Sequence, residues 1–465
     1  MELISWGAAQ RVTGSKHLLK TAKGHQVLLD CGLFQGIGTT PLNQSFGFDP
    51  AEVDAVLLSH AHIDHTGLLP RLVKKGFNGP IYSTPATKSL CEIMLLDSAM
   101  IQERDLARVN ERRKKRNEPV LEELFDVQDV QKTLKLFKTV AYHHAFSLFD
   151  ELTIRYFEAG HILGSAGIHI EWRNQQAQTK SLFFTGDIGR AGDKILRSPE
   201  PFPPSHYILM ESTYGNRLHT PAPDLEGNLL QIVRETCVER GGKVIIPAFA
   251  VDRTQELVYA LDRLHHAGLL PPIPVFVDSP LSVKATSVVR KHEEEYNQDM
   301  TEYIRRDGDA FGFDQLTYVT EVEDSKALNH INRPCVIISS SGMAEAGRVK
   351  HHIANQVGNP DNTILMVGYC SPNTLGHQLK SGAEVVRIFG EDFPVRAKIK
   401  SLEGFSAHAD YEEMLAYLGC QNPKDVQTVF LVHGEVEAQT FFKEKLHEAG
   451  FSQVEIPVQG QSFLL

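Results

Sequence analysis

Three histidines and one aspartate stand within six positions in the stretch LLSHAHIDHTG, residues 57–67. In an extended or turning segment, this H-x-H-x-D-H spacing lets His60 and His62 converge on one ion, while Asp64 and His65 point towards a neighbouring position. Imidazole nitrogens and carboxylate oxygens are the ligands that Zn²⁺ and similar borderline metals prefer. One histidine would be an ordinary hydrogen-bonding group in a polar turn, but four such side chains after an apolar run predict a metal site.

The signature is similar to that of the metallo-β-lactamase superfamily, in which the other metal ligands follow later strands one at a time. The resemblance implies that Asp30, in LLDCG, supports the metal loop without binding an ion. It also implies that His161, in FEAGHILGSAG, is the next ligand and that Asp187, in FFTGDIGR, bridges two metals. Two zinc ions about 3.5–4 Å apart would provide a hydroxide nucleophile at neutral pH. Metal-assisted hydrolysis is therefore predicted, with amide, thioester and phosphodiester bonds all open as targets.

Three residues in the second half of the chain narrow the substrate. Glu211 in ILMESTYGNR, His408 in LEGFSAHAD and His433 in TVFLVHGE resemble motifs A, B and C of the β-CASP family, which acts on nucleic acid. The resemblance implies that His433 completes the second metal site, that His408 protonates the leaving 3′-oxygen, and that Glu211 holds and tunes His408. It places Asp64 among the catalytic residues as well as the metal ligands. Capping of nearby turns or helices is the simpler interpretation of Glu211 and His408.

The stretch IISSSGMAEAGRVKHH, residues 337–352, predicts contacts to phosphate. Small residues between a strand and a helix offer backbone N–H groups and a favourable helix dipole to an anion. We expect Ser340, Ser341 and Gly342 to contact the substrate, with Arg348 one or two turns into the helix. An ordinary tight turn is the alternative. Arg253, at a similar junction in PAFAVDRTQE, is a weaker candidate.

The pattern of predicted strands and helices that must position these residues changes along the chain. Short strands and helices are predicted first, with strands at 25–32, 55–60, 79–85, 152–161, 166–173 and 180–189 and helices between 85 and 137. Strand-turn-helix units at 241–264, 274–292 and 333–356 predict parallel strands with crossover helices. With the resemblance, this predicts an α/β protein: a metallo-β-lactamase αββα sandwich of residues 1–206 and 391–465, with a doubly wound α/β β-CASP domain inserted at 207–390.

Composition sets the broader class. The 465 residues are 42% hydrophobic and 23% charged, as in ordinary soluble proteins, and the net charge of −11 argues against coating nucleic acid by bulk electrostatics. The six cysteines form no C-x-x-C pair, which predicts reduced thiols. No apolar run approaches the ~20 residues that cross a bilayer, and the N-terminus lacks a signal-peptide pattern. We therefore expect a cytoplasmic protein without a membrane partner.

The leading hypothesis is a ribonuclease with two Zn²⁺ ions per chain that cleaves single-stranded RNA endonucleolytically, with 5′→3′ exonuclease action left open. The chain resembles bacterial and archaeal homologues of the nuclease subunit of the cleavage and polyadenylation specificity factor. The C-terminal domain of RNase J and the N-terminal KH-type domains of archaeal relatives are not expected. The alternatives are a small-molecule metallo-hydrolase of thioesterase or lactonase type, and a catalytically weak scaffold that binds RNA or protein. DNA as substrate and a homodimer both stay open.

Overall fold

Two compact units make up the protein. The computed structural model describes residues 1–465 except 37, 220–223, 369, 372–373, 403 and 405. Unit 1 consists of Met1–Leu218 and His408–Leu465, and unit 2 of His219–Ala407. The domain boundaries expected from the sequence, at 206/207 and 390/391, remain predictions. Within the described ranges, no helix is both long enough and apolar enough to cross a membrane.

Unit 1 contains two seven-stranded sheets. The first has the order β22 (Gln461–Leu464), β1 (Glu2–Gly7), β2 (Lys16–Lys20), β3 (Gln26–Leu29), β4 (Ala55–Leu57), β5 (Ile81–Ser83), β6 (Phe137–Thr139). The second has the order β21 (Val454–Glu455), β20 (Thr428–Val432), β11 (Tyr207–Glu211), β10 (Thr179–Phe184), β9 (Ala166–Arg173), β8 (Leu152–Glu158), β7 (Phe146–Leu148). The strands expected from the apolar runs are all present, and β9 has the predicted bounds.

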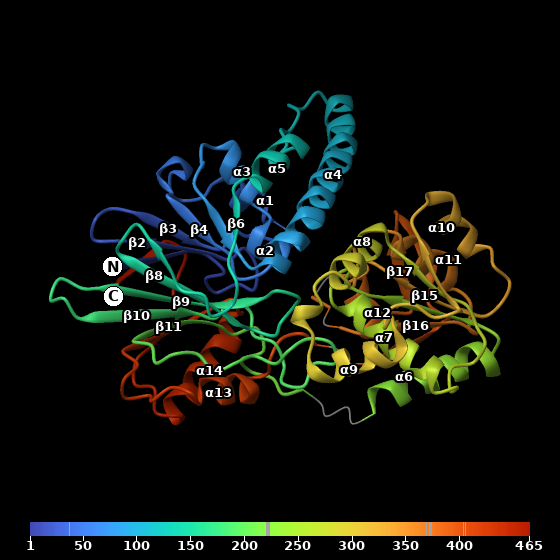
Figure 1. Ribbon diagram of the computed structural model, residues 1–465. Coiled ribbons are helices and arrows are strands. Elements are labelled where there is room, and N and C mark those ends of the chain that lie inside the picture. Colours follow the sequence, from blue (N-terminus) through green and yellow to red (C-terminus); the bar gives the residue numbers. More distant parts are fainter. Residues whose placement is uncertain (37, 220–223, 369, 372–373, 403, 405) are drawn as a thin grey trace. The chain divides into compact units, whose positions relative to one another are not determined.

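Helices cover the outer faces of these two sheets (Figure 1). On one side lie α1 (Thr40–Gln44), α2 (Ile63–Thr66), α3 (Leu69–Lys74), α4 (Pro85–Lys115) and α5 (Val127–Leu134); on the other lie α13 (Tyr411–Leu418) and α14 (Val436–Glu448). One apolar core joins residues of both sheets, and a second joins the second sheet to α13 and α14. The layers confirm the predicted αββα sandwich.

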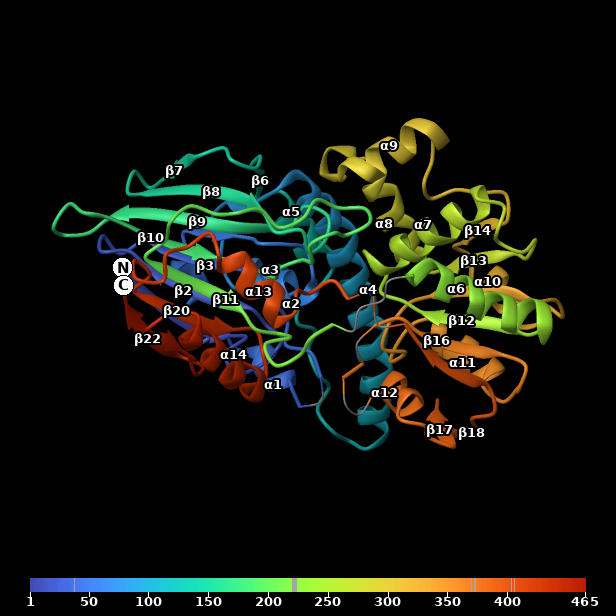
Figure 2. The same cartoon turned by 90° about the horizontal axis from the view of Figure 1, so that it is seen from below.

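Unit 2 is built around a six-stranded sheet whose paired strands are all parallel. The order is β14 (Leu316–Val319), β13 (Val275–Asp278), β15 (Cys335–Ser339), β12 (Lys243–Pro247), β16 (Thr363–Met366), β19 (Lys398–Ser401). Its helices are α6 (Leu225–Val233), α7 (Arg253–His266), α8 (Pro280–Val289), α9 (Gln298–Asp307), α10 (Val322–Asn329), α11 (Val349–Gln356) and α12 (Leu375–Lys380) (Figure 2). The hairpin β17 (Val385–Ile388) and β18 (Glu391–Pro394) completes it. The strand-turn-helix pattern is thus confirmed as a doubly wound arrangement.

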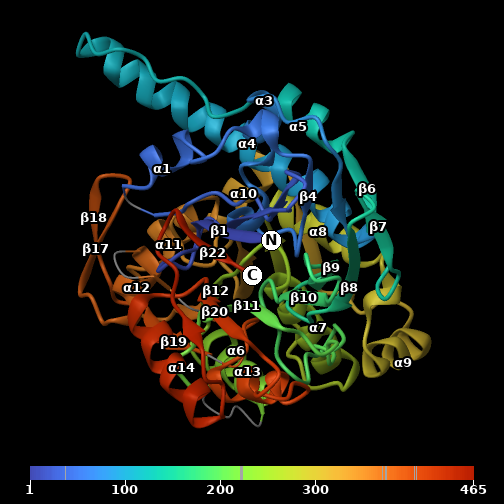
Figure 3. The same cartoon turned by 90° about the vertical axis from the view of Figure 1, so that its left-hand side faces the viewer.

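The two ends of the chain lie next to each other in unit 1, as Figure 3 shows. β1 and β22 pair antiparallel, and the Leu465 N–H donates to the Met1 carbonyl at 2.8 Å. All six cysteines are free thiols, and five of them are buried.

Candidate metal centre

The candidate ligands follow strands whose carboxyl ends meet. In the first sheet β3 and β4 are parallel neighbours, so Asp30 and the loop that carries His60 leave the sheet together. In the second sheet β10, β11 and β20 are parallel neighbours, and Asp187, Glu211 and His433 stand at or just beyond their ends. Parallel pairing is therefore what brings residues from distant parts of the sequence to one edge of the sandwich.

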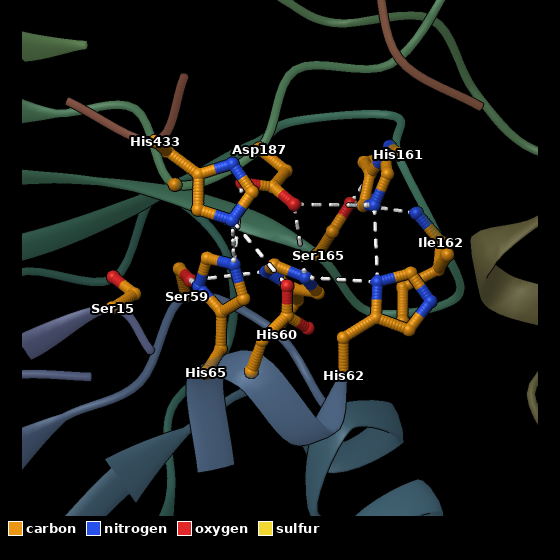
Figure 4. A network of polar contacts seen from close by, with 12 residues as sticks. Ser15, Ser59, His60, His62, His65, His161, Ile162, Ser165, Asp187 and His433 are labelled. Carbon is orange, nitrogen blue, oxygen red and sulfur yellow. Dashed lines mark hydrogen bonds and ion pairs between the residues drawn. The ribbon is translucent and has the colours of Figure 1, made fainter. Parts of the chain in front are cut away.

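One group of four side chains converges on a first position (Figure 4). His62 Nδ1 lies 3.2 Å from His60 Nε2 and 3.2 Å from His161 Nε2. Asp187 Oδ2 lies 3.5 Å from His60 Nε2 and 3.6 Å from His161 Nε2. His161 reaches this point from the connection between β8 and β9, which is the position the resemblance implied.

A second group lies beside the first and consists of Asp64, His65 and His433. His65 Nε2 is 3.1 Å from His433 Nε2, which is 3.4 Å from Asp64 Oδ2. The other oxygen of Asp187, Oδ1, lies 3.3 Å from His65 Nε2. Asp187 thus presents one carboxylate oxygen to each group, which is the geometry of a bridging ligand.

The chemistry of these seven side chains fits a pair of divalent cations. Imidazole nitrogens at 3.1–3.2 Å from one another are close enough for their lone pairs to bind one cation together. Burial lowers the pKa of His62 to about 4 and that of His60 well below its ordinary value, so both rings are neutral and able to bind a metal. Asp187 Oδ1 is buried and accepts no hydrogen bond from the described residues. An acceptor left in this state is costly without a positive charge beside it.

A layer of hydrogen bonds beneath the groups holds two of the histidines. Asp30, with a left-handed backbone (φ 57°), accepts from the Ser59 N–H and hydroxyl at 2.8 Å each and lies 2.6 Å from His65 Nδ1. Ser59 Oγ is also 3.1 Å from His60 Nδ1. A Cβ at Gly186 (φ 56°) would lie 2.5 Å from the Ser59 Cβ, so only glycine permits this approach. Asp30 therefore stands where support was expected. Ser59 was missed, although its place directly before the first histidine of the motif was a usable signal.

Glu211 and His408 form a contact beside the first group. His408 Nδ1 lies 3.1 Å from Glu211 Oε2, and the two rings of His408 and His161 lie 4.5 Å apart between centroids. Burial would lower the pKa of His408, but the charge of Glu211 and its hydrogen bond outweigh this and raise the pKa to about 9. The capping alternative is not what the structure shows, because Asp410 is the N-cap of α13 and Glu211 accepts from the Ile188 N–H.

The predicted phosphate-binding residues lie in unit 2, and one of them is placed differently from the prediction. Ser340, Ser341 and Gly342 follow β15 as expected. Arg348 was wrongly placed inside the helix: nine residues separate β15 from α11, and Arg348 is the N-cap residue. Its guanidinium pairs with the buried Asp278 carboxylate at 2.6 Å and donates to backbone carbonyls of β14 and the residue after it. Positive φ angles within this loop delay the helix, and the ion pair ties Arg348 to the sheet.

Arg253, the weaker candidate, is also engaged inside unit 2. It is the first residue of α7, is buried, and forms ion pairs with Asp252 and Glu256. Both arginines that the sequence suggested as phosphate ligands, Arg348 and Arg253, therefore already pair with carboxylates in unit 2.

Comparison with known proteins covers almost the whole chain. Residues 18–200 match the metallo-beta-lactamase superfamily domain, 254–379 the Beta-Casp domain, and 392–457 the Zn-dependent metallo-hydrolase RNA specificity domain. The chain is 36% identical over 437 residues to Ribonuclease TTHA0252 of Thermus thermophilus, covering 94% of each. It is 30% identical to the RNase J-like protein of Methanocaldococcus jannaschii, covering 98% of this chain and 97% of that one. It is also 30% identical to the transcription termination factor FttA of Methanosarcina mazei, covering 94% and 67%.

Proposed function

Because the chain belongs to the β-CASP ribonuclease family of the metallo-β-lactamase superfamily, we propose that it hydrolyses RNA phosphodiester bonds with two bound Zn²⁺ ions. The observation that carries the proposal is the placement of Asp187 between two ligand groups, with one oxygen towards each. His60, His62 and His161 would hold one ion, Asp64, His65 and His433 would hold the other, and Asp187 would contribute to both sites. Two such ions would supply a hydroxide at neutral pH and offset the negative charge of a phosphodiester.

The chain's own residues perform the proton transfer. His408 is held at Nδ1 by Glu211 and is protonated at neutral pH, so it can give a proton to the leaving 3′-oxygen. The leaving alkoxide is unstable in water, so a donor in contact with it lowers the barrier to bond cleavage. Glu211 orients the ring and keeps it charged between turnovers. Asp64, beside His433, contributes to the same centre as a ligand.

RNA is favoured over the small substrates of other metallo-hydrolases in the superfamily. Residues 392–457 match the RNA specificity domain of Zn-dependent metallo-hydrolases. Of the similar proteins, one is named a ribonuclease and another an RNase J-like protein. A scaffold without activity is disfavoured, because all seven expected ligands are present and converge. We propose single-stranded RNA as the substrate, cut internally and, from a 5′ end, also in the 5′→3′ direction.

The direct test uses RNA labelled internally or at its end, with either a 5′-phosphate or a 5′-hydroxyl. Cleavage to internal fragments is expected for RNA with either 5′ end. Release of labelled mononucleotides from the 5′ end would demonstrate 5′→3′ exonuclease activity as well. The Asp187→Ala protein, purified in parallel, reports any contaminating nuclease. Intact RNA beside rapid hydrolysis of a thioester or lactone would overturn the proposal, and faster cleavage of matched DNA would change the substrate.

Glu211→Gln is expected to change the pH dependence of cleavage. His408 acts as an acid, so activity is present below its pKa and is lost as the pH rises through it. Removing the Glu211 charge should return the pKa from about 9 towards its ordinary value of 6.5. The alkaline limb of kcat/KM against pH should therefore move to lower pH. If the alkaline limb of Glu211→Gln stays at the wild-type pH, Glu211 does not control the pKa of His408. The His408→Ala protein serves as the control, because it should lose this limb altogether.

A further inference from the structure

The two ring nitrogens of His433 face different partners. Nε2 points to the second ligand group, 3.1 Å from His65 Nε2 and 3.4 Å from Asp64 Oδ2. Nδ1 lies 3.0 Å from the hydroxyl oxygen of Thr213. The backbone of His433 is left-handed (φ 52°), a conformation that is uncommon outside glycine.

The direction of the bond to Thr213 follows from counting protons. The Thr213 hydroxyl lies 3.1 Å from the carbonyl oxygen of His433, which can only accept a hydrogen bond. A hydroxyl has one proton, and when that proton is donated to the carbonyl, the oxygen accepts from the ring. In this arrangement Nδ1 of His433 carries the proton and the lone pair is on Nε2. The Asp187 carboxylate, whose Oδ1 lies 3.6 Å from Nδ1, favours the same ring nitrogen as the site of the proton.

We propose that Thr213 is a positioning residue for the second metal: it selects the Nδ1–H tautomer of His433 and aims the Nε2 lone pair at the ion. The inference rests on the proposed metal centre, because it concerns one of its ligands. Partners of the outer ring nitrogen set both the tautomer and the orientation of metal-binding histidines. Neither the motif nor the resemblance singled out Thr213.

Thr213 belongs to a segment that serves both halves of the centre. Two residues earlier, Glu211 holds His408. Between them, the Ser212 hydroxyl donates to the carbonyl of Val432 at 2.7 Å, which joins the segment to the last residue of β20, directly before His433. The end of β11 therefore positions the proton donor through Glu211 and a metal ligand through Thr213. The two roles are separable by mutation, because the two side chains contact different histidines.

Thr213→Val provides the test, because valine keeps the shape of threonine and removes only the hydroxyl. Titration of the metal-free protein with Zn²⁺ against a chromophoric chelator should give one site of wild-type affinity and a second weakened by the ~10–100-fold typical of losing such a partner. Retention of the first site shows that the protein is folded. Thr213→Ser should restore the second site. Long-range ¹H–¹⁵N spectra of metal-free, histidine-labelled protein should show the Nδ1–H form of His433 in the wild type and a mixture in Thr213→Val.

Ser212→Ala is the matched control, since it removes a neighbouring hydroxyl that contacts the strand backbone and not the ring. It should keep both zinc affinities and the wild-type tautomer. Wild-type zinc affinities and an unchanged His433 tautomer in Thr213→Val would overturn the inference. A wild-type protein that binds fewer than two zinc ions would instead overturn the proposed metal centre, so the two failures are distinguishable in one titration.

Discussion

Replacing Asp187 with alanine is expected to remove zinc from both sites and to reduce RNA hydrolysis to background. The side chain offers one oxygen to each ligand group, so its loss leaves two incomplete sites rather than one. The loss of activity should exceed the ~10²–10³-fold that removal of one stabilising donor costs. Zinc content by mass spectrometry of the purified protein and the rate of RNA cleavage measure the two effects. His62→Ala should affect the first group alone and leave the second zinc bound.

Asp129→Asn is a suitable control, because Asp129 is also a buried carboxylate of unit 1 but belongs to the capping box of α5. It should keep both zinc ions and the wild-type rate. Full activity of Asp187→Ala, with two zinc ions still bound, would refute the bridging role and with it the two-metal proposal.

His408→Ala is expected to keep both zinc ions while cleavage slows by the ~10²–10⁴-fold typical of losing a general acid. His408 contacts Glu211 through Nδ1, and its ring lies 4.5 Å from the ring of His161, so it is close to the centre without belonging to either ligand group. Zinc titration and single-turnover cleavage of labelled RNA separate binding from chemistry.

The nature of the defect can be tested with the leaving group. A nitrophenyl phosphodiester releases a weakly basic oxygen that needs little help from an acid, so His408→Ala should be much less impaired on this substrate than on RNA. An equal defect on both substrates would assign His408 to binding or structure instead. Asp410→Asn, which changes a carboxylate close to His408 but retains an N-cap residue for α13, is expected to behave as wild type.

Much of the fold was predictable because local patterns report local structure. Apolar runs located β3, β4, β5 and β9, and strand-turn-helix spacing predicted the parallel sheet of unit 2. The two helices expected between 85 and 137 are α4, which ends at Lys115, and α5, which begins at Val127. Arg348 was misplaced, because the positive φ angles in the preceding loop are a property of backbone conformation that composition does not reveal.

By itself the sequence indicated the kind of chemistry: the spacing from His60 to His65 and the family resemblance supplied the candidate metal ligands and the candidate proton donor in order. Only the tertiary structure decided how they act together. His65 and His433, 368 positions apart, meet because the sheet that contains β4 packs against the sheet that contains β20, and local periodicity does not predict how two sheets pack. The parallel pairing of β11 and β20 sets the Thr213 hydroxyl against His433, and Asp187, beyond the end of the neighbouring β10, presents its two oxygens to different groups. Ligand identity is a property of residue types, whereas bridging and ring orientation are properties of contacts that exist only in the folded chain.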